Sequence, residues 1–171
     1  MSIRTLKAEF LEALFGEDDL GVVIRTHIHI ESSVNRLLNL LISLPDELPQ
    51  LRYDQKLKLC CAMGMDKTLY PALKALGDLR NAFGHNIDTK LTSKSISQLL
   101  AAVSPDDMET IGLSYTSTRT AVDKALPKSF SELEPKSQLI GFAIWLNAAL
   151  DAMQEGVIAR VAQKPVVLGP Q

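Results

Sequence analysis

The chain has 171 residues, of which 46% are apolar and 22% are charged, and its formal net charge is −2. This length provides one full hydrophobic core and is short for two ordinary domains, so we expect a single domain over residues 1–163. The slightly acidic balance excludes a protein that coats nucleic acid through a general excess of Lys and Arg, because such binding depends on neutralising many phosphates. Any contact with nucleic acid must therefore be local.

Leucine and alanine are frequent and aromatic residues make up only 5% of the chain, which favours helices over a β-sandwich. Apolar residues recur at helical spacing, and Gly, Pro and capping residues separate the helical segments. In chain order, we expect helices over about 3–15, from after Asp19 to the break at Pro45, over about 53–63, from a cap at Asp66 or Thr68 to Gly84, and over about 93–103, 116–125 and 136–162. The sequence thus predicts an all-α bundle of about six to seven helices.

Three further expectations concern individual segments. The apolar positions of the helix that follows Asp19 cover more than one face, which indicates a central helix packed on two sides. Ser104 and Pro105 form a strong helix start, whereas residues 108–115, which include Gly112, allow helical or partly extended structure. We expect the tail, residues 164–171, to be extended.

The chain carries no sign of export or membrane insertion. Its N-terminus has no uninterrupted apolar region of the signal-peptide kind, and no apolar run reaches membrane-spanning length. The two cysteines, Cys60 and Cys61, are adjacent within an apolar helical pattern, as expected of buried thiols in a reducing compartment. We therefore expect a cytoplasmic protein.

The common signatures of cofactor and metal sites are absent from the sequence: a Gly-rich phosphate loop, G-x-S-x-G, HExxH and a CxxC pair. His27 and His29 face different sides of one helix, and Glu31 follows His27 at the i+4 position. No third ligand has a suitable spacing, so we interpret His27 and Glu31 as a surface pair and expect no metal and no cofactor.

Recognisable chemistry is concentrated in Arg80-Asn81-Ala82-Phe83-Gly84-His85. Arginine holds phosphate oxygens in a fixed fork and histidine exchanges protons near neutral pH, so the two together suit a phosphodiester. Five residues is off the i, i+4 stripe of a helix, and we therefore expect Gly84 to end the helix in the left-handed conformation and His85 to turn back toward Arg80 or toward a partner subunit. Asn81 could orient the histidine.

A purely structural interpretation of the same residues is also open. A histidine that follows a helix-ending glycine, and an arginine in the last turn, both interact favourably with the negative end of the helix dipole. In that case Arg80 and His85 would only stabilise the end of the helix.

The motif Arg80-Asn81-x-x-x-His85 resembles the R-x(4–6)-H motif of the HEPN superfamily. The order of a long apolar helix, the segment 56–65 and the segment 76–85 is similar to the mannitol operon repressor (MtlR) family, and this resemblance covers about residues 17 to 92. The HEPN resemblance implies an RNA-directed protein, a metal-independent endoribonuclease in which two copies of the motif meet across a homodimer. His85 would then exchange a proton with the ribose 2′-hydroxyl or the 5′-oxygen, Arg80 would stabilise the phosphorane, and Asn81 would orient the histidine.

The MtlR resemblance implies a different role, that of a transcriptional regulator. The sequence lacks a helix-turn-helix with an arginine-rich recognition helix, so regulation would act through a protein partner. Under this alternative, Arg80, Asn81 and His85 are structural. We place the RNA-directed function first.

Overall fold

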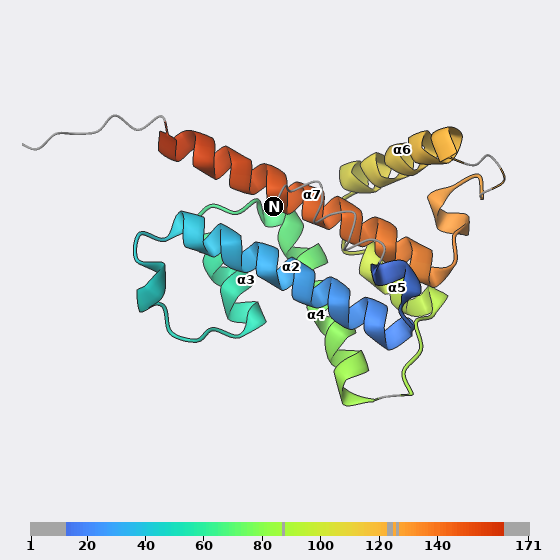
Figure 1. The fold of residues 1–171 in the computed structure, drawn as a ribbon, viewed down its shortest axis with the longest axis horizontal. Coiled ribbons are helices and arrows are strands. Elements are labelled where there is room, and N and C mark those ends of the chain that lie inside the picture. The colour runs from blue at the N-terminus through green and yellow to red at the C-terminus, as the bar shows by residue number, and fades with distance from the viewer. Residues whose placement is uncertain (1–12, 87, 123–124, 126, 163–171) are drawn as a thin grey trace, which may run out of the picture.

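A computed structural model of the chain describes residues 13–86, 88–122, 125 and 127–162, and this part of the chain contains helices and no strand (Figure 1). A helical turn at residues 13–16 comes first. The longer helices are α2 (Asp19–Leu41), α3 (Tyr53–Ala62), α4 (Tyr70–His85), α5 (Ser93–Leu100), α6 (Pro105–Val122) and α7 (Pro135–Ala162), and short 3₁₀ helices cover Pro45–Glu47, Lys67–Leu69 and Phe130–Glu132. The predicted all-α multi-helix bundle is confirmed.

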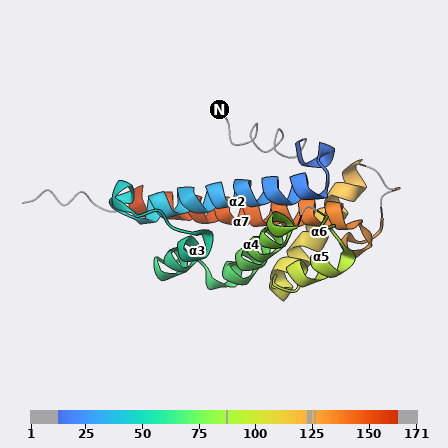
Figure 2. The ribbon, with the colours of Figure 1, turned by 90° about the horizontal axis from the view of Figure 1, so that it is seen from below.

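Helices α2 and α7 lie side by side and run in the same direction, as Figures 1 and 2 show from two sides. The other helices pack on this pair. Helices α3 and α4 contact α2 and each other, α5 contacts α4 and α7, and α6 contacts the first half of α7. Helix α2 therefore has neighbours on two sides, as its apolar pattern predicts.

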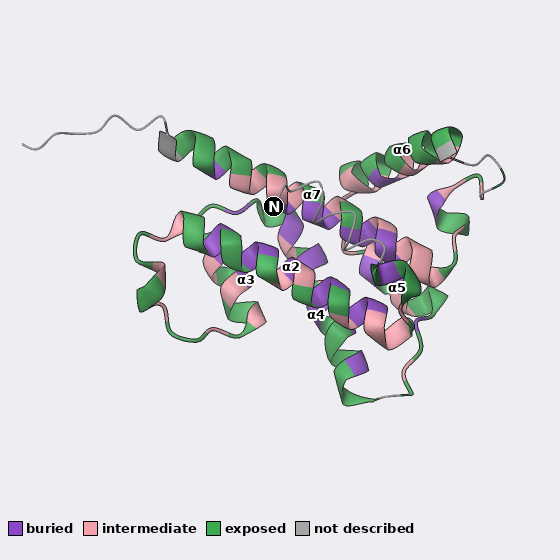
Figure 3. Ribbon diagram, viewed as in Figure 1, coloured by how far each residue is buried: buried purple, intermediate pink, exposed green. Residues whose placement is uncertain are grey.

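The hydrophobic core follows α2 along its whole length and continues into α7 (Figure 3). Helix α2 buries side chains at helical spacing toward α7 on one side and toward α3 and α4 on the other, and a third face is exposed. The largest fully buried side chains include Ile30, Leu37, Leu57, Leu73, Leu76, Phe142, Leu146 and Leu150. These residues come from α2, α3, α4 and α7, so one continuous core holds the four helices together.

A small polar link fixes the alignment of α2 on α7. The hydroxyl group of Ser33 donates to Oδ1 of Asn147 over 3.2 Å, and Nε2 of His29 lies 3.2 Å from the same oxygen. Two helical turns further along α7, the side chain of Gln154 donates to the carbonyl oxygen of Ser33. Ser33 and Asn147 are buried, and paired polar groups of this kind are satisfied in one register of the two helices only.

Side chains cap several helices near the predicted starts. Asp18 accepts from the N–H of Gly21 at the start of α2, one residue before the predicted position. Asp66 accepts from Thr68 at the start of the 3₁₀ helix Lys67–Leu69, and α4 itself begins later, at Tyr70, with Pro71 in its first turn. Ser104 accepts from the N–H of Asp107 at the start of α6. Each side chain satisfies an N–H group that has no partner within the helix.

Helix α6 is longer than the sequence predicts. Residues 108–115, which allow partly extended structure by pattern alone, are helical, and α6 runs without a break to Val122. The threonine hydroxyl groups at 110, 116, 118 and 120 donate to the carbonyl groups four residues earlier, so these polar residues satisfy themselves within the helix. The strong cap at Ser104 then starts a helix that nothing interrupts.

Several expectations fall on other parts of the chain. Most of the expected helix over about 3–15, residues 3–12, lies outside the described residues, and so does the tail at 164–171. Cys60 is buried and Cys61 half-buried, and both are free thiols. Among the described helices, none is long and apolar enough to cross a membrane.

We expect Asn147→Ala to lower the free energy of unfolding by about 1–3 kcal/mol, because the substitution leaves the buried hydroxyl of Ser33 without its acceptor. The matched control is Asn35→Ala on the exposed side of α2, which we expect to change stability by less than about 0.5 kcal/mol. Urea unfolding followed by circular dichroism measures both. Equal stability of the two variants would show that the polar link contributes nothing.

Candidate functional site

Helix α4 carries the Arg80-Asn81-x-x-x-His85 motif in its last turns. The apolar stripe of this helix is buried against α2 and α3, and Leu79 and Phe83 hold its last two turns on the core. Arg80, Asn81 and His85 are exposed. The motif therefore lies on a firmly packed helix and presents its polar groups to solvent.

Gly84 does not end the helix, so this prediction is wrong. Helix α4 continues through Gly84 to His85, and Asn86 follows with extended backbone. Among the described residues, only Gly64 has a positive φ. The reason is that buried Phe83 holds the last turn in place, and a glycine followed by one more helical residue needs no left-handed conformation there. Arg80 and His85 are consequently about 140° apart around the helix axis and roughly 7.5 Å apart along it.

Asn81 contacts the arginine of the motif. Nη1 of Arg80 donates to Oδ1 of Asn81 over 3.1 Å. The amide therefore orients the guanidinium group, whereas the sequence predicts that it orients the histidine. His85 is exposed, and none of the described residues forms a hydrogen bond with it that would fix its ring. The histidine is thus free to contact a ligand or a second protein chain.

A polar hollow of about 670 Å³ adjoins the motif between α2, α3 and α4. Arg80 and Asn81 form part of its wall, and His85 does not. The other lining residues are His27, Glu31, Arg52, Tyr53, Asp54, Leu57, Lys58, Tyr70, Lys74, Gly77 and Asp78. The structure therefore brings two of the three predicted site residues, Arg80 and Asn81, together with residues of α2 and α3.

His27 is the buried polar residue of this hollow. Its side chain is nearly inaccessible to solvent, with a relative exposure of 3%, and its ring lies 4.5 Å from that of Tyr53. Nδ1 is 3.8 Å from a carboxylate oxygen of Glu31, whereas Nε2 is buried without a hydrogen-bond partner among the described residues. The pairing with Glu31 is as predicted, but the expected surface position is wrong, because α3 and α4 cover this face of α2.

The environment of His27 favours the neutral imidazole. Burial lowers the pKa of His27 below its usual 6.5, and the nearby cations Arg80 and Lys56 lower this pKa further. The carboxylate of Glu31 opposes them and raises it. The net result is that the neutral form of His27 is favoured at pH 7 and that the ring gains its proton only at a lower pH than a free histidine does.

Tyr53 sets the distance between α3 and α4. Its hydroxyl group donates to the carbonyl oxygen of Leu73 over 3.1 Å, and its ring lies directly on Gly77. A Cβ atom on Gly77 would come within 2.9 Å of the ring. Burial raises the pKa of Tyr53 far above 10, which keeps the hydroxyl group protonated as a donor. Gly77 thus allows the ring to form one wall of the hollow.

The acidic groups in the wall of the hollow are each paired with a lysine. Nζ of Lys56 lies 2.7 Å from Glu31, Nζ of Lys58 lies 2.8 Å from Asp54, and Nζ of Lys74 lies 2.6 Å from Asp78. By contrast, the guanidinium groups of Arg52 and Arg80 form no ion pair with any carboxylate in the described ranges. The hollow therefore has two uncompensated positive charges.

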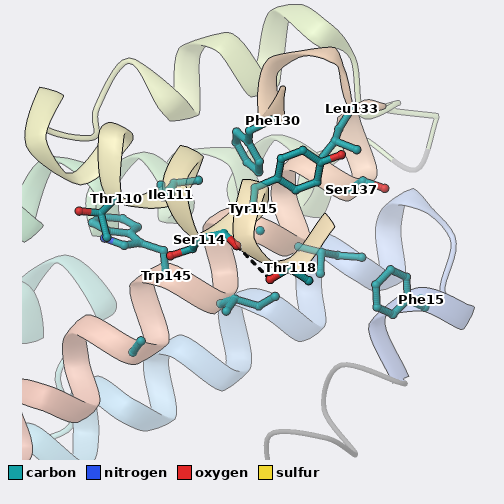
Figure 4. A pocket seen from close by; sticks show the side chains of 14 residues that line it. Phe15, Thr110, Ile111, Ser114, Tyr115, Thr118, Phe130, Leu133, Ser137 and Trp145 are labelled. Carbon is teal, nitrogen blue, oxygen red and sulfur yellow. Dashed lines mark hydrogen bonds between the residues drawn. The ribbon is translucent and has the colours of Figure 1, made fainter. Parts of the chain in front are cut away.

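A second hollow, of about 410 Å³, lies between α6 and α7 and is apolar (Figure 4). Phe15, Tyr115, Phe130 and Trp145 line it from different segments, and none of the described residues that line it is charged. The polar groups of its aromatic walls are already satisfied: the hydroxyl of Tyr115 donates to a backbone carbonyl and the indole N–H of Trp145 donates to Asp107. This hollow suits an apolar group and not a phosphate.

The fold and the site together define an all-α protein with an exposed Arg-Asn-x-x-x-His motif beside a polar, cationic hollow. The chain matches no protein-family model, no curated protein and no solved structure. No group of three His, Cys, Asp or Glu residues in the described part of the chain lies close enough together to hold a metal ion. Sequence reasoning missed Arg52, Tyr53 and Gly77 as site residues, since they belong to no motif and only the packing of α3 on α4 brings them together.

Two glycines of α4 provide a matched pair of substitutions. We expect Gly77→Ala to lower the free energy of unfolding by about 1–2 kcal/mol, because overpacking against Tyr53 outweighs the gain in helix propensity. Gly84→Ala places its methyl group in open space, and we expect it to stabilise the protein by about 0.5 kcal/mol. Urea unfolding measures both changes, and the same sign for both would contradict this packing of α3 on α4.

The lowered pKa of His27 makes stability depend on pH. The unfolded chain binds a proton at His27 near pH 6.5, and the folded protein binds it only at lower pH, so the stability present above pH 6.5 is progressively lost as the pH falls toward the folded-state pKa. We expect wild type to lose more stability than His27→Gln when urea unfolding at pH 7.5 is compared with that at pH 5.5. Parallel losses in the two proteins would show that His27 titrates normally.

Proposed function

We propose that the protein acts on RNA as a metal-independent endoribonuclease of the HEPN type, with Arg80, Asn81 and His85 as its active-site residues. The observation that carries this proposal is the exposure of all three side chains at the end of a well-packed helix, without a carboxylate partner for Arg80 among the described residues or a fixed hydrogen bond for His85. A purely structural role would bury these groups or bond them to the last carbonyl groups of the helix.

The proposed reaction uses only groups that the chain and the RNA supply. The ribose 2′-oxygen attacks the phosphorus atom as a base removes its proton, the bond from phosphorus to the 5′-oxygen breaks, and an acid protonates that oxygen. The products are a 2′,3′-cyclic phosphate and a 5′-hydroxyl. Arg80 stabilises the charge that develops on the phosphorane, and the hydrogen bond that its guanidinium group donates to Oδ1 of Asn81 holds this group in place.

This chemistry requires a second copy of the chain. One histidine cannot serve as both base and acid at the same time, and Arg80 and His85 point to different sides of α4. A two-fold axis beside the end of α4 would bring the two His85 side chains to one phosphate. Ala82 and Gly84 are exposed and small, so they permit the close approach of two helices at this point.

We expect the wild-type protein to cleave single-stranded RNA in the presence of EDTA, and His85→Ala to lose about 10²–10⁴-fold in rate while it folds normally. The matched control is Lys90→Ala, which removes an exposed cation shortly after the motif. Gel analysis of labelled RNA measures the rate, and circular dichroism checks the fold.

Mixing wild-type and His85→Ala chains tests whether the site is shared. After the chains are unfolded and refolded together, activity should follow the square of the wild-type fraction if each site needs both histidines, and the fraction itself if each chain acts alone. A linear dependence would overturn the composite site. A wild type as inert as His85→Ala toward a broad panel of RNAs would overturn the ribonuclease.

The alternative is a non-catalytic regulator of the MtlR kind that acts through a protein partner. The apolar hollow between α6 and α7 supports this alternative, because two apolar side chains that line it, Phe15 and Ile144, are exposed by 63% and 48%. Exposed apolar groups around a hollow are typical of protein-binding surfaces. The ribonuclease remains the first proposal since it accounts for the motif.

A further inference from the structure

We infer that the polar hollow between α2, α3 and α4 is a phosphate-binding site, with Arg52, Arg80 and His27 as its ligand-binding residues. The identification of its natural ligand as a phosphate of an RNA strand rests on the proposed function. The binding of a phosphate as such is independent of that function, because it follows from the charges and the unpaired groups of the wall.

The first argument is the balance of charge. Each carboxylate in the wall has a lysine within 2.8 Å, so none of them needs a guanidinium group as its partner. Arg52 and Arg80 approach the hollow from α3 and α4 and keep their charges uncompensated within the described part of the chain. Guanidinium groups hold phosphate oxygens in a bidentate geometry, so an anion with several oxygens is the ligand that fits.

The second argument is the unpaired nitrogen of His27. A buried polar atom without a hydrogen bond is costly and uncommon in folded proteins, and a missing ligand is one explanation for it. His27 lines the hollow, but its Nε2 is closed to solvent, so a small movement of the wall must open it before it can donate its proton to a phosphate oxygen. Of the charged groups around this ring, Glu31 favours the protonated form and Arg80 and Lys56 disfavour it. A bound phosphate would offset the two cations.

The position of the hollow defines its place on an RNA strand. It lies on the side of α4 that faces α2 and α3, and Arg80 is in its wall, whereas His85 is not. The phosphate that it binds is therefore a neighbour of the one that is cleaved, and Arg80, which stabilises the cleaved phosphate in the proposed reaction, lies between the two. Its volume of about 670 Å³ exceeds that of a phosphate and lies within the usual range of ligand pockets, so a whole nucleotide can enter.

Isothermal titration calorimetry with inorganic phosphate, adenosine 5′-monophosphate and a 2′-O-methylated RNA that cannot be cleaved tests the inference. We expect Arg52→Gln to bind phosphate about tenfold more weakly than wild type, since it loses a charge-assisted contact. Arg160→Gln makes the same change of charge at an exposed position on α7 outside the hollow, and we expect it to bind like wild type. Equal affinities of the two variants would overturn the site.

The nitrogen signal of His27 provides a second readout that does not depend on the variants. Addition of inorganic phosphate should shift the ¹⁵N resonance of His27 Nε2 in a long-range NMR spectrum, and an unchanged resonance at saturating phosphate would also overturn the site. His85→Ala should keep phosphate binding and lose cleavage, which separates this inference from the proposed function. If Arg52→Gln weakens the binding of the methylated RNA as well as of phosphate, the hollow lies on the RNA path. If it weakens only phosphate and the mononucleotide, the site is one for free nucleotides.

Discussion

Helix α2 must satisfy two sets of neighbours at once, and the rest of the structure depends on this constraint. On one side it packs along α7 through the polar link of Ser33 and Asn147, and on the other it packs against α3 and α4. Two histidines that are two residues apart therefore have different environments. His29 contacts Asn147 of α7, and His27 contacts Tyr53 of α3. The polar hollow lies where α3 and α4 cover the face of α2 that carries His27 and Glu31.

The packing of α3 on α4 determines the shape of that hollow. Tyr53 lies on Gly77, so the two helices approach closely there, and the charged side chains Arg52 and Asp54 lie beside this contact in the wall of the hollow. Lysine and carboxylate side chains neutralise one another there, and the two arginines do not take part. A site with this balance attracts an anion locally while the chain as a whole carries a net charge of −2. An acidic protein can therefore bind a phosphate where its local charge is positive.

The sequence predicts the helices well where one strong local signal marks each end. Helices α3 and α7 begin and end within one residue of the predicted bounds, and Ser104 caps α6, whereas α5 ends at Leu100, about three residues before the predicted end. The errors occur where tertiary contacts decide. Burial of Phe83 keeps Gly84 helical, and α3 and α4 cover His27. The motif could be found from its residue types alone. Arg52 could not, because its relation to Arg80 arises only when two helices pack together.

The parallel arrangement of α2 and α7 has a consequence for how the chain folds. Ser33 and Asn147 are 114 residues apart in sequence, so the central helix pair is a long-range contact and its formation must close a large loop. During synthesis, α2, α3 and α4 leave the ribosome well before α7 does, and they can begin to pack with one apolar side of α2 still open to water. The helices that carry the site thus come together first, and the cooperative native state is reached only when the last helix covers the exposed side of α2.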